Sequence, residues 1–209
     1  MSEDHLAFYT NPRSRGQIAR WMLEEIGVPY QTEIVQFGPS RSKRFLSINP
    51  MGKVPAIVHN GTVVTEVAAI CAYLADAFPE ADMAPPPSER GDYYRWLFFV
   101  AGPLEAAATN KALSVEVPVD KQGMVGYGTL ERVVDTLAAA VGRRPFIAGD
   151  KFSAADVYVG SHINWGMQFG TLPKHPRFLS YWDRLADRSA YRRAGMLDDE
   201  LAKTGTEAG

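Results

Sequence analysis

A proline at the entrance to a predicted strand constrains this chain more than any other feature of its sequence. Val54-Pro55 precedes the run Ala56 to Val58, and a second strand-like run, Thr62 to Val64, follows Asn60-Gly61. Asn-Gly between two such runs is a strong signal for a β-hairpin. Proline lacks a backbone N–H, and its cis peptide bond costs little free energy. A cis bond here would leave the N–H and C=O of Val54 without a strand partner, so an extended ligand could bind both.

The chain before this hairpin has the pattern of a βαβ unit. Leu6 to Tyr9 predicts a short buried strand, and apolar residues then recur at helical spacing up to the stop signal Gly27-Val28-Pro29. Tyr30 to Ile34 alternates as a second strand, and a crossover of about this length joins parallel strands. After the hairpin, helical spacing resumes from Val67 to Leu74. The order βαβ followed by ββα is typical of a thioredoxin-like domain.

Strand signals fade in the second half of the chain. Residues 81–88 have the composition of a stiff connector, and helical spacing then runs from Tyr94 to Ala108 and from Tyr127 to Val141. Ser153 to Asp156 predicts a capping box in which Asp156 stabilises a helix start. We predict an α/β fold joined to an all-α fold, divided into a thioredoxin-like domain at 1–82, a linker at 83–88, an all-helical domain at 89–203 and a disordered tail at 204–209.

Charge and cysteine content argue against several classes of function. With 22 basic and 24 acidic residues and no run of like charges, we expect no binding to nucleic acid or to an anionic membrane. No apolar stretch approaches the roughly 20 residues that cross a bilayer. The single cysteine, Cys71, excludes an internal disulfide, and Met1 to Asp4 lacks the features of a signal peptide, which together predict a cytoplasmic protein. The four histidines show no metal-ligand spacing, so we predict no metal.

The run Asn49-Pro50-Met51-Gly52-Lys53-Val54-Pro55-Ala56-Ile57-Val58, together with Thr65-Glu66, resembles the glutathione-binding half of glutathione transferases. The resemblance covers nearly the whole chain. It implies that the main chain beside Pro55 binds glutathione, that Glu66 holds its ammonium group and that Lys53 meets its glycyl carboxylate. It also implies that the N–H of Val67 meets the γ-glutamyl carboxylate at a helix N-terminus. Relatives usually carry Ser at this last position, so weaker binding is expected.

The segment Phe8 to Gly16 matches the turn that carries the thiol-activating group in this family. Because it contains no cysteine, the chain is similar to hydroxyl-using, cytosolic, bacterial-type members, and thiol-disulfide exchange is disfavoured. A hydroxyl that donates to the glutathione sulfur at a helix N-terminus favours the thiolate. The segment matches two family patterns, so the candidates are Ser14, which we prefer, then Tyr9 and Asn11, with Arg15 adding positive potential. Taken alone, Ser14 predicts an ordinary helix cap and Tyr9 a half-buried strand residue.

The resemblance further implies a homodimeric detoxification enzyme that conjugates the glutathione thiolate to a small apolar electrophile. Large apolar residues of the helical half most often belong to its core. Those that face the first domain would instead line an electrophile pocket, and the candidates are Trp96, Phe99, Pro103, Trp165 and Phe169. A glutathione-dependent isomerase, dehalogenase or peroxidase would use the same thiolate. A non-catalytic binding protein of the same fold is the other alternative, and Val67 is the feature that favours it.

Overall fold

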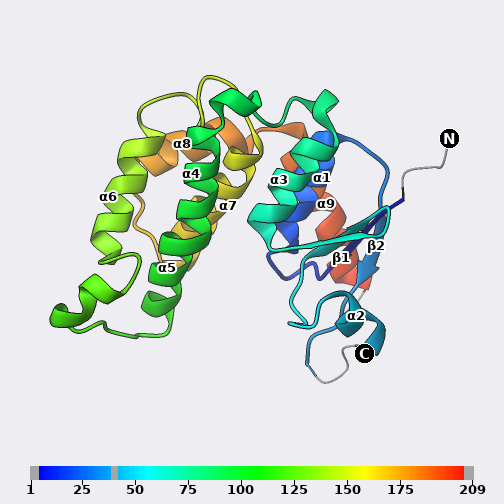
Figure 1. Cartoon of the computed structure of the whole chain (residues 1–209), viewed down its shortest axis with the longest axis horizontal. Coiled ribbons are helices and arrows are strands. Elements are labelled where there is room, and N and C mark those ends of the chain that lie inside the picture. The colour runs from blue at the N-terminus through cyan, green and yellow to red at the C-terminus, as the bar shows by residue number, and fades with distance from the viewer. Residues whose placement is uncertain (1–4, 39–41, 205–209) are drawn as a thin grey trace. The chain divides into compact units, whose positions relative to one another are not determined.

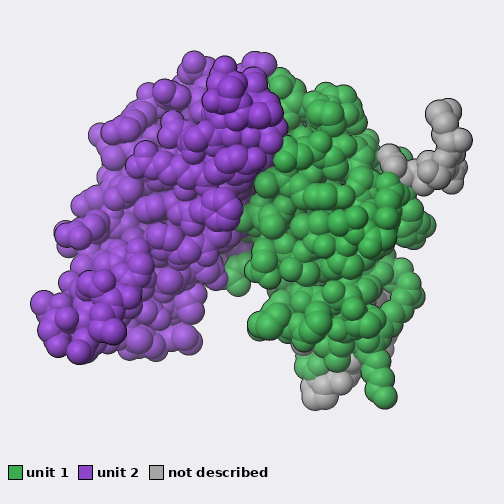
Figure 2. Space-filling view, viewed as in Figure 1, with its two compact units in different colours: residues 1–83, 188–209 green, residues 84–187 purple. Residues whose placement is uncertain are grey.

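The computed structural model describes residues 5–38 and 42–204. The chain divides into two compact units, of which unit 1 comprises residues 1–83 with 188–209 and unit 2 comprises residues 84–187 (Figure 2). Unit 1 therefore draws on two segments that are distant in the sequence. The limits of independently folding domains stay a prediction, since these units are defined by contacts within the native fold.

Unit 1 is built on a four-stranded sheet of order β2-β1-β3-β4 (Figure 1). Strand β1 runs parallel to β2 and antiparallel to β3, and β3 pairs antiparallel with β4. The predicted hairpin turn is confirmed, because Asn60 and Gly61 both have the positive φ angles that such a tight turn requires. The strands are β1 (Leu6–Thr10), β2 (Gln31–Ile34), β3 (Ala56–His59) and β4 (Thr62–Thr65).

Helices cover both faces of this sheet. Successive side chains of a strand point to opposite faces, and in β1 the ring of Tyr9 packs against Phe45 of α2, whereas the ring of Phe8 lies under the guanidinium of Arg20 in α1. Helix α1 ends where the sequence predicts, at Gly27, whose φ of 70° is the left-handed conformation that suits glycine. The helices of unit 1 are α1 (Gly16–Ile26), α2 (Lys43–Ile48), α3 (Val67–Ala77) and α9 (Ser189–Thr204).

Helix α9 is the last helix among the described residues, and it packs against α1. The small side chains of Ala190 and Ala194 are buried along it, one turn apart, and Asp198 continues the same buried stripe. Asp198 accepts a hydrogen bond from Arg20 Nε at 2.8 Å. The helix extends to Thr204, where the sequence predicts the start of a disordered tail, and residues 205–209 lie outside the described residues.

Unit 2 is helical, as predicted, and α7 is its most buried helix. Side chains are buried around nearly the whole circumference of α7, which packs against α4 and α8. The predicted capping box at Ser153 and Asp156 is confirmed. The helices of unit 2 are α4 (Gly91–Phe99), a π-helical segment (Val100–Leu104), α5 (Glu105–Ala112), α6 (Leu130–Val141), α7 (Ala154–Phe169) and α8 (Pro176–Ala186).

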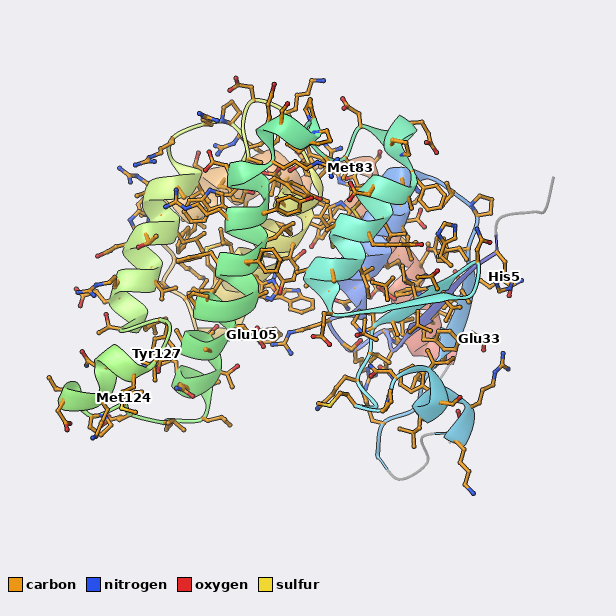
Figure 3. All side chains as sticks on the ribbon, in the orientation of Figure 1. His5, Glu33, Met83, Glu105, Met124 and Tyr127 are labelled. Atoms are coloured by element: carbon orange, nitrogen blue, oxygen red, sulfur yellow. The ribbon has the colours of Figure 1, made fainter. Side chains whose placement is uncertain are left out.

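Two helices of unit 2 differ from the sequence pattern. The helix predicted from Tyr94 to Ala108 is interrupted by the π-helical segment, which contains Pro103, because proline cannot supply the N–H of a regular helical hydrogen bond. The helix predicted from Tyr127 begins only at Leu130, capped by the side chain of Thr129. Tyr127 instead lies in the segment before α6 (Figure 3). Its hydroxyl accepts a hydrogen bond from Asn110 Nδ2 at 2.7 Å, which ties this segment to α5.

Candidate functional site

Strand register brings the predicted glutathione-binding segments to one end of the sheet in unit 1. Tyr9 of β1 pairs with Ala56 of β3, and Ala56 pairs on its other side with Thr65 of β4. Three segments therefore lie at the same end of the sheet: the turn that follows β1, the Val54-Pro55 pair that precedes β3, and Glu66, which follows β4. Helices α1 and α3 both begin at this end of the sheet, so both direct the positive end of a helix dipole there.

The peptide bond between Val54 and Pro55 is cis, as the sequence predicts. Within the residues that the structure describes, no hydrogen bond engages the main chain of Val54. The preceding loop is held by Asn49, whose Nδ2 donates to the Lys53 carbonyl at 2.8 Å and whose Oδ1 accepts from the Met51 N–H at 3.1 Å. The buried side chain of Asn49 thus fixes the loop that presents Val54.

The turn between β1 and α1 is closed by hydrogen bonds of its own residues. Ser14 is half-buried, and its Oγ donates to the Asn11 carbonyl at 2.6 Å and accepts from the Gly16 N–H at 2.9 Å. The Asn11 side chain is also engaged, since Nδ2 donates to the Val35 carbonyl at 3.1 Å and Oδ1 accepts from the Arg13 N–H at 3.0 Å. Asn11 therefore anchors the turn, and Ser14 presents its hydroxyl beside the first N–H groups of α1.

Tyr9 and Arg15, the other two candidates for thiol activation, have different environments. Tyr9 is buried in a cluster with Ala7, Val35 and Phe45 on the face of the sheet that α2 covers. Arg15 is exposed and is the N-cap residue of α1, although its side chain makes no capping hydrogen bond. Of the candidate hydroxyls, that of Ser14 lies directly in the turn at the helix start.

The three residues predicted to bind the two ends of glutathione also lie at this end of the sheet. Lys53 and Glu66 are exposed, whereas Val67 is buried as the first residue of α3. Glu66 is the N-cap residue, with φ 65° and ψ 117°, a backbone conformation that non-glycine residues rarely adopt. Such strained residues are concentrated at ligand-binding sites, where the surrounding structure holds them in place.

The five predicted electrophile-pocket residues lie in unit 2, and their role stays a prediction. Trp96 is buried, with its ring 5.4 Å from that of Phe99 in an edge-to-face arrangement. Phe99, Pro103 and Trp165 are half-buried, whereas Phe169 is 77% exposed. Pro103 falls within the π-helical segment, a type of distortion that is frequent at functional sites.

Sequence reasoning did not single out Gly16 and Asn49. A Cβ atom built on Gly16 would overlap the side chain of Thr10, so only glycine lets α1 start this close to β1. Asn49 has the loop-closing bonds described above, and the dipeptide Asn49-Pro50, which is typical of a turn, was the available signal in the sequence. Both residues position the main chain at the predicted site.

Cys71 behaves as predicted, as a thiol buried in the core. Burial raises its pKa to about 12, so at neutral pH it is protonated and unreactive. Across residues 5–38 and 42–204, no group of three or more His, Cys, Asp or Glu side chains is arranged to hold a metal. Over the same ranges, no helix combines the length and the apolar character needed to cross a membrane.

Comparison with known proteins identifies the family. The profile described as "Glutathione S-transferase, N-terminal domain" matches residues 14–77. Glutathione S-transferase GstA of Escherichia coli O157:H7 is 29% identical over 58% of this chain, and the match covers 61% of the length of GstA. Glutathione S-transferase-like protein gedE of Aspergillus terreus is 30% identical, with 70% of each chain covered.

Solved structures agree with this identification. A glutathione transferase from Methylococcus capsulatus matches with a TM-score of 0.76 and 28% identity, over 93% of this chain and 98% of the other. The theta class glutathione S-transferase from Xanthomonas axonopodis pv. citri, solved with glutathione bound, gives a TM-score of 0.71 and 25% identity, over 92% and 98%. The chain belongs to the glutathione S-transferase family, and the predicted combination of a thioredoxin-like fold with a helical fold is confirmed.

Proposed function

We propose that this chain binds glutathione at the end of the unit 1 sheet where these segments meet, and that it transfers the glutathione thiolate to a small apolar electrophile. The observation that carries the proposal is the strand register, which brings the β1–α1 turn, Val54 and Glu66 to that end of the sheet. The glutathione bound to the Xanthomonas relative supports the choice of ligand. In keeping with the family, we further propose a cytoplasmic, bacterial-type homodimer with a detoxifying role.

Each part of the tripeptide has a chemically suitable partner in this arrangement. The exposed Glu66 carboxylate would pair with the ammonium of the γ-glutamyl residue, and the Val67 N–H at the start of α3 would donate to its carboxylate. The unpaired N–H and C=O of Val54 would bind the cysteinyl main chain as an added strand does. Lys53 is exposed and would meet the glycyl carboxylate.

Ser14 is the group we propose for thiol activation. Its Oγ now donates to the Asn11 carbonyl, and rotation of the hydroxyl would redirect this donation to the bound sulfur while the Gly16 N–H continues to donate to Oγ. The thiol proton would pass to solvent, and the thiolate would be stabilised by this hydrogen bond and by the N-terminus of α1. Lowering a thiol pKa of about 8.5 by roughly two units corresponds to about 3 kcal/mol and makes most of the ligand anionic at neutral pH.

Two substitutions separate the candidate hydroxyls. Ser14→Ala should reduce kcat/KM for a chlorinated aromatic substrate by about tenfold or more, because one hydrogen bond to the thiolate is lost. Tyr9→Phe should leave it nearly unchanged, because the Tyr9 ring belongs to the core. Titrating the ultraviolet absorbance of the bound thiolate measures the thiol pKa directly, which should rise in Ser14→Ala. An unchanged pKa in that variant would remove Ser14 from the mechanism.

Glutathione binding is tested independently of turnover. Glu66→Ala should weaken the affinity measured by isothermal titration calorimetry by about tenfold or more, since a charge-assisted contact is worth roughly 1.5–3 kcal/mol. Glu80→Ala, which removes an exposed carboxylate elsewhere in unit 1, is the matched control. Equal affinities in all three proteins would exclude Glu66 from the site.

A second candidate function is non-catalytic glutathione binding. Val67 provides no hydroxyl, and the donor of Ser14 already has a partner in the Asn11 carbonyl. Retention on immobilised glutathione, without turnover of any electrophile or peroxide, would support this alternative. A panel that adds isomerase, dehalogenase and peroxidase substrates also distinguishes the other reactions that share the same thiolate.

A further inference from the structure

Unit 2 contains a cavity that the proposed glutathione chemistry does not use. It is a solvent-open cavity of about 560 Å³, lined mostly by exposed residues, and it lies between the C-terminal end of α6, with the turn that follows it, and the first turns of α8. A volume of this size is within the usual range for small-molecule sites. Its walls are formed by Val141, Gly142, Arg143, Arg144, Pro145, Pro176, Arg177, Ser180 and Arg184.

Four of the nine lining residues are arginines, and none is acidic. This concentration contrasts with the whole chain, which carries 22 basic and 24 acidic residues and a formal charge of −2. Among the residues that the structure describes, the ion pair that involves this cavity joins Arg144 Nη1 to Asp92 Oδ2 at 4.0 Å, with both side chains about half exposed. An exposed pair at that distance is weak. The cavity is therefore a local site of positive potential.

Two of the guanidinium groups are held in place by uncharged acceptors. Arg184 donates through Nε to the Pro145 carbonyl at 3.0 Å and through Nη1 to Ser180 Oγ at 3.1 Å. Arg177 Nη1 donates to the Ala138 carbonyl at 3.5 Å. Arg184 Nη2 also donates to the Val141 carbonyl at 3.4 Å, so both arginines cap carbonyls in the last turn of α6, but none of these bonds neutralises the charges. They also restrict the side chains, so less conformational entropy is lost when an anion binds.

The backbone contributes in two ways. Gly142 leaves room for Arg177, because a Cβ atom at this position would lie 2.9 Å from Arg177 Cδ. Helix α8 begins at Pro176, and the positive end of its dipole offsets the negative end of the α6 dipole at the cavity, which leaves the field of the arginines dominant. Arginine forms bidentate hydrogen bonds with phosphate oxygens, and its guanidinium stays charged at every physiological pH.

We propose that this cavity binds a small phosphate-bearing anion, separately from the glutathione site in unit 1. Four guanidinium groups around a cavity of this volume suit a ligand with two linked phosphates better than a single inorganic phosphate. Like charges that line one cavity repel one another, and a bound dianion or trianion reduces that repulsion. Ser180 adds a neutral hydroxyl to the recognition of a phosphate oxygen.

The test is isothermal titration calorimetry of the full chain with inorganic pyrophosphate at low ionic strength. We expect one site per chain, and we expect the affinity to fall at least tenfold in Arg143→Ala combined with Arg177→Ala. Arg132→Ala, an exposed arginine of α6 outside the cavity, is the matched control and should bind within twofold of the unchanged protein. Circular dichroism checks that each variant is folded.

Gly142→Ala provides a second variant in which no charge is removed. The added methyl should displace Arg177 and weaken pyrophosphate binding by about threefold or more. Titrations with inorganic phosphate and with adenosine diphosphate show whether a free diphosphate or a nucleotide is preferred. Absence of pyrophosphate binding, or an equal loss in Arg132→Ala, would overturn the proposal. So would binding of a single-stranded RNA oligonucleotide in the absence of any pyrophosphate binding.

Discussion

Each unit contains a fully buried aspartate, and the two are stabilised in opposite ways. In unit 2, Asp156 accepts four hydrogen bonds from uncharged donors: the Ile147 N–H, the Ser153 N–H, the Ser153 hydroxyl and the Tyr181 hydroxyl, at 2.7–3.0 Å. In unit 1, Asp198 faces one cation, and Arg20 Nε donates to its Oδ1 at 2.8 Å. Asp156 is held by a network of dipoles, whereas Asp198 depends on one opposite charge.

The difference extends to the atoms that remain unpaired. Within the described parts of the chain, Asp198 Oδ2 and Arg20 Nη2 are both buried without a hydrogen-bond partner. Arg20 is held in addition by the Tyr30 hydroxyl at 3.1 Å and by the faces of the Phe8 and Tyr30 rings. Burial raises the pKa of both aspartates, to about 6 for Asp156. A buried ion pair fixes the position of α9 on α1, but it adds less stability than a fully satisfied network.

The largest effect is expected for Asp156→Ala. It would leave four donors without an acceptor, including two that hold the start of α7, and should lower the free energy of unfolding by about 4 kcal/mol. Urea unfolding followed by tryptophan fluorescence measures the change. Asp150→Ala, an exposed aspartate nearby in the chain, is the control and should stay within about 0.5 kcal/mol of the unchanged protein. A similar small loss for both variants would contradict the importance of the network.

The pH dependence of Asp156 tests the same site without removing it. Because its pKa rises from 3.8 in the unfolded chain to about 6 in the folded chain, the folded state binds more protons between these values. The stability contributed by Asp156 is complete below about pH 4 and is lost as the pH rises through 6, by about 3 kcal/mol. Asp156→Asn removes this titration, so the stability difference between wild type and variant should shrink between pH 4 and 7. A constant difference would show that the pKa is not raised.

Asp198→Ala should cost about 3 kcal/mol, because it leaves the buried charge of Arg20 without compensation. Asp199→Ala changes the exposed neighbouring aspartate and should have little effect. The sharper comparison replaces both partners with apolar residues, Arg20→Met with Asp198→Leu. This double variant should recover most of the lost free energy of unfolding, since two buried charges are removed together. If the double variant is as unstable as Asp198→Ala, the burial of these two charges does not lower the stability of unit 1.

The smallest effect is expected at the exposed end of the α1–α9 contact. Arg193 Nε lies 2.7 Å from Glu24 Oε2, but the Arg193 side chain is 47% exposed and is screened by solvent. Arg193→Ala should therefore lower the free energy of unfolding by less than about 1 kcal/mol. The same urea titration measures it, and a loss comparable with that of Asp198→Ala would show that burial does not set the strength of these pairs.

The features that the sequence predicted correctly depended on local signals. Pro55 indicated a cis bond before a strand, Asn60-Gly61 indicated the hairpin, and Ser153 to Asp156 indicated a helix cap. Helix α9 gave no comparable signal, because its buried stripe consists of two alanines and an aspartate rather than large apolar residues. The π-helical segment was also missed, since an apolar pattern does not reveal a change in hydrogen-bond register.

By itself, the sequence determined the succession of the four strands, the cis bond at Val54-Pro55 and the membership of a glutathione-binding family, because each depends on residues that are close together in the chain. Only the tertiary structure decided which segments meet at the end of the sheet and how α9 pairs Asp198 with Arg20. It also decided where four arginines line one cavity. These features arise from contacts between residues far apart in the sequence. Their polar partners follow no periodic pattern, so hydrophobic spacing cannot reveal them.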